Sequence, residues 1–180
     1  MSRANRMMRN SEMTTPELGI KIENTRDYPV NADRLIYAAR LTLKQNEATD
    51  RGGITIVLTG DDEVRALNRE YRHFDSVTDV LTFPAYPLPD DIVQEMDEPP
   101  YLGDLVIAYP YTCAQAERLG HSPADSLSLL VVHGTLHLLG HDHDTPERRA
   151  AMWDVQANAL RALSISEDIV PWLEGADHGG

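Results

Sequence analysis

Four histidines within residues 133–143 are the side chains of this sequence best suited to chemistry. His133 and His137 are four residues apart, and side chains at that spacing project from one face of a helix on consecutive turns. Gly140 permits a sharp turn, after which His143 can bring a third imidazole back to the first two. Imidazole nitrogens are common metal ligands, so the spacing predicts a metal site.

Three protein nitrogens leave one coordination position open for water or substrate, which is typical of catalytic zinc. Two alternatives stay open. One is that the histidines are buried structural residues, although each unpaired ring in an apolar core costs free energy. The other is a closed structural site with His141 or Asp142 as the fourth ligand. We expect one Zn²⁺ per chain, held by His133, His137 and His143 in an open site.

The residue at position 134 separates this pattern from the zinc proteases that have the same histidine spacing. Metzincins carry H-E-x-x-H-x-x-G-x-x-H, in which the glutamate is the base that deprotonates the attacking water. Gly134 occupies the glutamate position in this sequence. The sequence therefore predicts a metzincin-like zinc site without the base that peptide hydrolysis requires.

A buried helix is predicted to carry the first two histidines. Ser122 is a suitable N-cap, Pro123 fits the first helical position, and Asp125 can complete a capping box. Residues 127–139 are apolar on almost every side, which is typical of a helix buried all round. Gly140 is expected to end the helix as its C′ residue.

An arginine row, Arg65, Arg69 and Arg72, occupies positions i, i+4 and i+7 of a second predicted helix over 61–73. Such a row is most often a solvated charged face. In so acidic a chain it is also the best candidate for a groove that binds phosphate groups. The face of this helix that is predicted to pack on the core consists of Val64, Leu67 and Tyr71.

Composition sets limits on the class of protein. The chain has 180 residues, 42% of them hydrophobic and 25% charged, as expected for one globular domain. The net charge of −13 argues against non-specific nucleic-acid binding over the whole surface. Cys113 is the single cysteine, which fits a reducing cytoplasm. We expect no membrane span and no secretory signal, because no apolar run is long enough and the basic N-terminus lacks a hydrophobic segment.

The order of the remaining elements predicts the fold class. Strands are expected over 18–23, 54–58, 77–83 and 103–108, and further helices from Asn31 or Asp33 to 45, over 110–119, and from Pro146 onward. Residues 84–101, rich in proline and acid, are expected to form a mobile loop. The pattern indicates one α+β domain with a small mixed four-stranded sheet covered by about five helices. That domain is expected over 17–165, between a disordered leader (1–16) and a flexible tail (166–180).

Beyond the histidine stretch, short segments in the same order resemble one family. The sequence around His133–His143 is similar to the signature of the YbeY family of bacterial ribosomal RNA maturation factors, described as metal-dependent endoribonucleases. The other segments that agree are Leu67-Asn68-Arg69-x-Tyr71-Arg72, residues 78–83, Gly103-Asp104-Leu105 and Met152-Trp153. The resemblance covers roughly residues 50–163.

The resemblance implies that His133, His137 and His143 are zinc ligands and that Arg72 is the arginine of the cleft near the metal. It implies processing of ribosomal RNA ends, especially of the small subunit, and ribosome quality control in the cytoplasm. The expected partners are ribosomal RNA and small-subunit components, with no DNA and no membrane. It assigns no ligand role to His141.

The chemistry expected from these residues is phosphodiester cleavage. Zinc in such a cage activates water and polarises a phosphoryl oxygen, and Arg72 is the expected catalytic residue that stabilises charge in the transition state. Arg65 and Arg69 are expected to contact flanking phosphates. The general base stays open between the activated water itself and Asp142. Two other functions stay open: a non-catalytic zinc-stabilised ribosome assembly factor, and a metzincin-like peptide hydrolase with a base from elsewhere.

Overall fold

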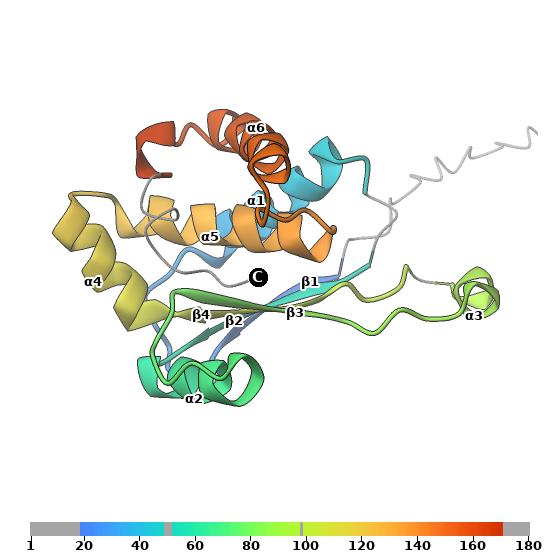
Figure 1. Ribbon diagram of the computed structural model, residues 1–180, viewed down its shortest axis with the longest axis horizontal. Helices are drawn as coiled ribbons and strands as arrows, with labels where there is room; N and C mark the ends of the chain where they lie inside the picture. The colour runs from blue at the N-terminus through green and yellow to red at the C-terminus, as the bar shows by residue number, and fades with distance from the viewer. Residues whose placement is uncertain (1–18, 49–51, 98, 171–180) are drawn as a thin grey trace, which may run out of the picture.

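The computed structural model describes residues 19–48, 52–97 and 99–170. Its strands form one mixed sheet in the order β1-β2-β4-β3. The strands are β1 (Ile20–Asn24), β2 (Ile54–Thr59), β3 (Val80–Pro84) and β4 (Gly103–Ala108). β1, β2 and β4 are parallel, whereas β3 pairs antiparallel with β4 and forms one edge of the sheet (Figure 1). The predicted single α+β domain with a four-stranded mixed sheet is confirmed.

Six α-helices and a short 3₁₀ helix accompany the sheet within these residues. They are α1 (Ala32–Gln45), α2 (Asp61–Arg72), α3 (Asp90–Glu95), α4 (Tyr109–Leu119), α5 (Pro123–Leu138), α6 (Pro146–Ala162) and the 3₁₀ helix Glu167–Ile169. The helix absent from the prediction is α3, which lies inside the segment 84–101 that was expected to be a loop. Its acidic first turn, Asp90 and Asp91, suits a helix N-terminus.

The helices cover the two faces of the sheet unequally. In Figure 1, α1, α5 and α6 lie on one side of the sheet and α2 lies on the other. The large hydrophobic core fills the first side, and a small cluster that includes Val64, Leu81 and Val106 fills the second. Strand alternation divides β3 between them: Val80 belongs to the large core, and Leu81 and Phe83 face α2. The edge strand β3 therefore contributes side chains to both clusters.

The prediction for the packing face of α2 was wrong at Tyr71. Val64 is fully buried, but the next buried residue is Asn68, whose amide donates to the Ser76 carbonyl at 2.8 Å. Tyr71 is 59% exposed. It lies in the last turn of the helix, where its ring contacts the ring of Phe83 on the edge strand. The core face of α2 thus ends one turn earlier than the apolar pattern predicts.

The ordered fold extends past residue 165, where the predicted domain ends. Ile169 is 5% exposed, and both it and Val170 pack on the large core, so the first residues of the expected tail belong to the domain. The expected leader (1–16) and the rest of the tail (171–180) lie outside the described residues. Among the helices of the described ranges, none combines the length and the apolar character that a membrane crossing requires.

Candidate metal and phosphate site

Helix α5 positions the first two histidines, and its ends form largely as predicted. The Ser122 hydroxyl accepts from the Asp125 N–H at 3.4 Å, with Pro123 in the first turn. The capping box is not completed, because the Asp125 carboxylate instead pairs with the Arg34 guanidinium of α1. Eleven positions after Ser122, where the helix is buried, it carries His133, which is 1% exposed.

Gly140 ends the histidine helix and turns the chain back, as predicted. Its φ is +93°, a left-handed conformation that favours glycine. The Gly140 N–H donates to the His137 carbonyl at 2.9 Å and the His141 N–H to the Leu136 carbonyl at 3.0 Å. These two bonds make a Schellman motif, which satisfies carbonyls at the helix end. The turn places the following loop directly beside His137.

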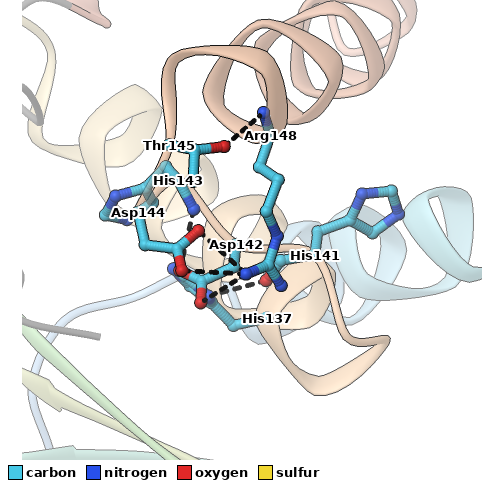
Figure 2. A network of polar contacts seen from close by, with 7 residues as sticks. All are labelled: His137, His141, Asp142, His143, Asp144, Thr145 and Arg148. Carbon is cyan, nitrogen blue, oxygen red and sulfur yellow. Dashed lines mark hydrogen bonds and ion pairs between the residues drawn. The ribbon is translucent and has the colours of Figure 1, made fainter.

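The loop that returns the third histidine is fixed by short polar contacts (Figure 2). The Asp142 carboxylate accepts from the His143 backbone N–H at 2.7 Å. Arg148, in the first turn of α6, donates to Asp144 at 2.8 and 2.9 Å and lies 3.7 Å from the Asp142 carboxylate. His143 is therefore held by the N-terminus of α6, through a carboxylate that Arg148 orients.

The three histidines converge on one point. Their candidate ligand nitrogens all lie within 4.8 Å of one another. The Nε2 atoms of His133 and His137 are 3.1 Å apart, close to the roughly 3.4 Å expected for two nitrogens at tetrahedral positions on one zinc ion. The Nε2 of His143 is buried and has no hydrogen-bond partner among the described residues. This cluster can hold a metal ion, as the sequence predicted.

Hydrogen bonds on the far side of the rings orient the lone pairs of the first two histidines. His133 Nδ1 lies 3.0 Å from the Gln156 side-chain oxygen, and His137 Nδ1 lies 3.0 Å from the His141 carbonyl oxygen. Both partners are acceptors, so each Nδ1 carries the proton and each Nε2 presents a lone pair. A cation bound between two such lone pairs, whose nitrogens are 3.1 Å apart, would remove their mutual repulsion. The residues present therefore fit a bound metal.

Helix α6 provides the back wall of the cage. The Trp153 indole contacts the rings of His133 and His143 edge to face, with centroid distances of 5.9 and 5.5 Å. Burial, together with the smaller effect of the neighbouring His143, lowers the pKa of His137 to about 4. A neutral imidazole at pH 7 is the form that binds metal. His137 is thus in the form that binds metal.

Arg72 lies beside the cage, although it comes from the opposite face of the sheet. A cavity of about 290 Å³ is lined by Arg72, Val80, Thr82, Pro84, His133, His137, Gly140, His141 and Asp142. Because α2 and α5 cover opposite faces, Arg72 reaches this cavity past the edge strand β3. Burial lowers the pKa of the Arg72 guanidinium, while the nearby Asp79 carboxylate raises it. The structure thus brings a half-buried guanidinium to the mouth of the histidine cage.

Arg65 and Arg69 do not join Arg72 at the cavity. The Arg65 guanidinium makes two hydrogen bonds to the Asp75 carboxylate, at 2.9 and 3.0 Å, and Arg69 lies 3.9 Å from the same carboxylate. Both side chains are exposed. Contacts between these two arginines and flanking phosphates stay a prediction. A phosphate that binds either arginine must compete with the Asp75 carboxylate for the guanidinium.

Gly134 has a packing role that accounts for the missing glutamate. A Cβ atom at this position would lie 2.6 Å from Cδ2 of Leu105, a fully buried side chain of β4. Helix α5 therefore approaches the sheet too closely for a side chain at 134. The direction of that missing Cβ is toward β4, so a carboxylate there would enter the core.

Comparison with known proteins now places this site in a family. The family model described as "Endoribonuclease YbeY" matches residues 21–164, a range that contains the whole cavity lining. The chain belongs to the YbeY family. Proteins named "Endoribonuclease YbeY" from Chloroflexus aurantiacus and Roseiflexus sp. are 41% and 35% identical to it. These matches cover 72% and 87% of this chain, and 86% and 99% of the relatives' length.

A solved structure has a similar fold. The solution structure of a protein from Thermotoga maritima matches with a TM-score of 0.51 and 23% sequence identity. The match covers 89% of this chain and 99% of the Thermotoga chain. It supports the arrangement of helices and strands alone, and the site rests on the histidine geometry and the family.

Two residues of α6 that the sequence did not assign to the site contact its histidines. Gln156 is fully buried and accepts from His133, and Trp153 contacts two of the three histidines. The signal for Gln156 was present in the sequence: a glutamine on an otherwise apolar helix face requires a buried polar partner. Its partner could not be identified, because the packing of α6 on α5 is not encoded in either helix alone.

Proposed function

We propose that this chain is a zinc-dependent endoribonuclease that cleaves single-stranded RNA. The observation that carries the proposal is the convergence of three imidazole rings, two of which line one cavity together with Arg72. Membership of the YbeY family, whose curated relatives are named endoribonucleases, supports RNA as the substrate. Three nitrogen ligands without thiolate or carboxylate are typical of catalytic zinc.

The residues divide the chemistry between them. A zinc ion bound to His133, His137 and His143 supplies a Lewis acid and lowers the pKa of bound water. Arg72 binds the scissile phosphate through its planar guanidinium and stabilises the charge that grows on the phosphoryl oxygens. Asp142 positions the His143 loop, because its carboxylate already accepts from a backbone N–H and lies near Arg148.

The proposed substrate in the cell is ribosomal RNA. We infer that the enzyme processes the ends of small-subunit RNA in the cytoplasm and takes part in ribosome quality control, as expected for the family. The acidic chain does not suit loose binding over its whole surface, so RNA must be recognised at the local cavity where Arg72 lies. Small-subunit components are the proposed partners.

The test is cleavage of a precursor of small-subunit ribosomal RNA by the purified protein, with product ends mapped by sequencing. We expect cleavage that disappears after chelation and returns with zinc. A peptide library is the matched control substrate. Tight zinc binding with no RNA cleavage would favour the alternative function, a non-catalytic zinc-stabilised ribosome assembly factor. Peptide hydrolysis by the wild-type protein would establish the protease alternative.

A further inference from the structure

An aromatic pair, in which Tyr71 is exposed and Phe83 is half-buried, lies on the face of the sheet opposite the histidine cage. The ring centroids of Tyr71 and Phe83 are 5.2 Å apart with an interplanar angle of 76°, an edge-to-face arrangement. Tyr71 remains 59% exposed although it lies at the end of a helix whose neighbouring turn is buried. In an edge-to-face pair at least one face of each ring does not touch the other ring. A planar ligand can therefore reach a face of Tyr71.

Phe83 is anchored in the sheet and supports the Tyr71 ring. Phe83 is half-buried and packs on the small cluster that includes Val64, Leu81 and Val106. The backbone of Phe83 is held in the antiparallel ladder opposite Asp104. The Tyr71 ring thus rests on a side chain anchored in the sheet, so ordering it for binding requires little further loss of conformational freedom.

The same two residues are continuous with the metal and phosphate site. Tyr71 directly precedes Arg72, and Phe83 lies between Thr82 and Pro84, two residues that line the cavity. Because side chains alternate along a strand, Thr82 faces the cavity while Phe83 faces the α2 side of the same edge. A chain molecule whose phosphate contacts Arg72 can therefore cross the edge strand β3 and meet Tyr71 with its neighbouring unit.

We propose that Tyr71, supported by Phe83, is a stacking site for a nucleobase adjacent to the phosphate held at Arg72. The proposal rests on the endoribonuclease function stated above and extends it to substrate recognition. Every nucleobase offers a π-face, so such a site selects unpaired bases without selecting a sequence. Bases within a duplex are stacked on one another and cannot reach Tyr71. The site therefore favours single-stranded RNA over a helix.

The test measures cleavage of a fluorescein-labelled single-stranded RNA with the zinc-loaded protein in excess, over a range of protein concentrations. Tyr71→Leu keeps an apolar side chain but removes the ring. We expect it to raise the protein concentration for half-maximal rate about tenfold, in keeping with loss of one base–aromatic stack. The rate at saturation should change little. Tyr71→Trp should retain wild-type binding. Tyr37→Leu is the matched control, since Tyr37 is 55% exposed on α1 across the sheet.

Abasic RNAs provide a second, independent arm. Removing the base at successive positions should weaken wild-type binding about tenfold at one position, and removing that base should have no further effect in Tyr71→Leu. Equal half-maximal concentrations for wild type and Tyr71→Leu, or additive losses with the abasic RNA, would overturn the stacking site. If the wild-type protein cleaves no RNA, the proposed function fails. Fluorescence anisotropy of the intact RNA then tests the stacking site with the same variants, and equal affinities would overturn it.

Discussion

The histidine cage and the arginine row of α2 differ in what lies opposite each side chain. The three histidines are enclosed by α5, the returning loop and α6, and acceptors behind the first two rings turn their Nε2 atoms toward one point. The three arginines lie on an exposed helix, and the fold separates them: Arg65 and Arg69 face Asp75, whereas Arg72 reaches the cavity.

This difference shows what gives a charged or polar side chain a function. Spacing along a helix places residues on one face, but the elements packed against that face decide which of them meet. Enclosure holds the histidines within ligating distance, because their rings have few other positions. An exposed arginine can pair with any nearby carboxylate at small net gain, and Asp75 provides one. Loss of one histidine is therefore expected to abolish metal binding. Loss of one arginine is expected to remove only the contact that this arginine makes.

The largest effect is expected from loss of a cage ligand. His137→Ala should abolish stoichiometric metal binding and lower the cleavage rate about 10³-fold or more, because the Lewis-acid contribution amounts to several kcal/mol. His141→Ala is the matched control, since His141 serves the cage through its backbone carbonyl. Elemental analysis and single-turnover rates measure both variants. Full metal content in His137→Ala would refute the cage.

The next effect tests the division within the arginine row. Arg72→Ala should keep its metal and lower the single-turnover rate about 10²–10³-fold, the loss typical for one donor to transition-state charge. Arg72→Lys should recover only part, because an ammonium cannot make the two-point contact. Arg65→Ala and Arg69→Ala should mainly weaken RNA binding and flatten its salt dependence. A loss of catalytic rate in all three alanine variants would show that the row acts as one groove.

A smaller loss of metal affinity is expected from substitution of Gln156, the acceptor behind His133. Gln156→Leu removes the acceptor and should weaken metal affinity about 10–100-fold, as is typical for residues that orient a metal-ligating histidine. Gln156→Glu keeps an acceptor and should bind metal nearly as well as wild type. Competition with a chelator of known affinity gives the constants, and melting curves verify that both variants fold. Unchanged affinity in Gln156→Leu would remove Gln156 from the site.

Gly134 tests whether packing alone excludes a side chain beside the cage. Gly134→Ala should lower the free energy of unfolding by about 1–3 kcal/mol, the usual cost of overpacking a core, because its Cβ meets Leu105. The same substitution in a Leu105→Ala background should cost less, since the clash is gone. Chemical denaturation of the four proteins gives the coupling. An equal cost in both backgrounds would place the role of Gly134 elsewhere.

The smallest effect concerns the pH dependence of stability near Arg72. Burial raises the pKa of Asp79 to about 7, so its charged form is disfavoured in the folded protein. The fold then loses stability as pH rises from about 4, the pKa of an unfolded aspartate, to about 7. Asp79→Asn should therefore gain melting temperature relative to wild type between pH 5 and pH 8. Asp75→Asn is the exposed control, because Arg65 lowers the pKa of Asp75 and reverses the sign. A difference that does not change with pH would contradict the raised pKa.

The histidine cage could be predicted because most of its information is local. The i, i+4 spacing, the glycine turn and the third histidine all lie within residues 133–143, and the capping residues of α5 and α6 mark where the helices begin. The strands and their mixed pairing followed from alternation and from the order of elements. Of the α-helices in the described residues, only α3 was not predicted, because its proline-rich, acidic surroundings resemble a loop, and the 3₁₀ helix Glu167–Ile169 lies in the segment that was expected to be a tail.

The rest depended on contacts between segments far apart in the sequence. Asp75 neutralises Arg65 across a turn whose geometry no periodicity gives, and Arg34 of α1 takes the carboxylate expected in the α5 capping box. Tyr71 was assigned to the core because its spacing fits the apolar face. The sequence does not show that the sheet edge lies under that last helical turn.

The measurement that tests the account most directly is a zinc titration of the metal-free protein, in which bound zinc and cleavage of one defined single-stranded RNA are followed together. The account predicts that both rise in parallel and saturate at one zinc per chain, with His137→Ala showing neither. RNA cleavage by fully metal-free protein at the wild-type rate, or saturation of zinc binding without cleavage, would contradict it.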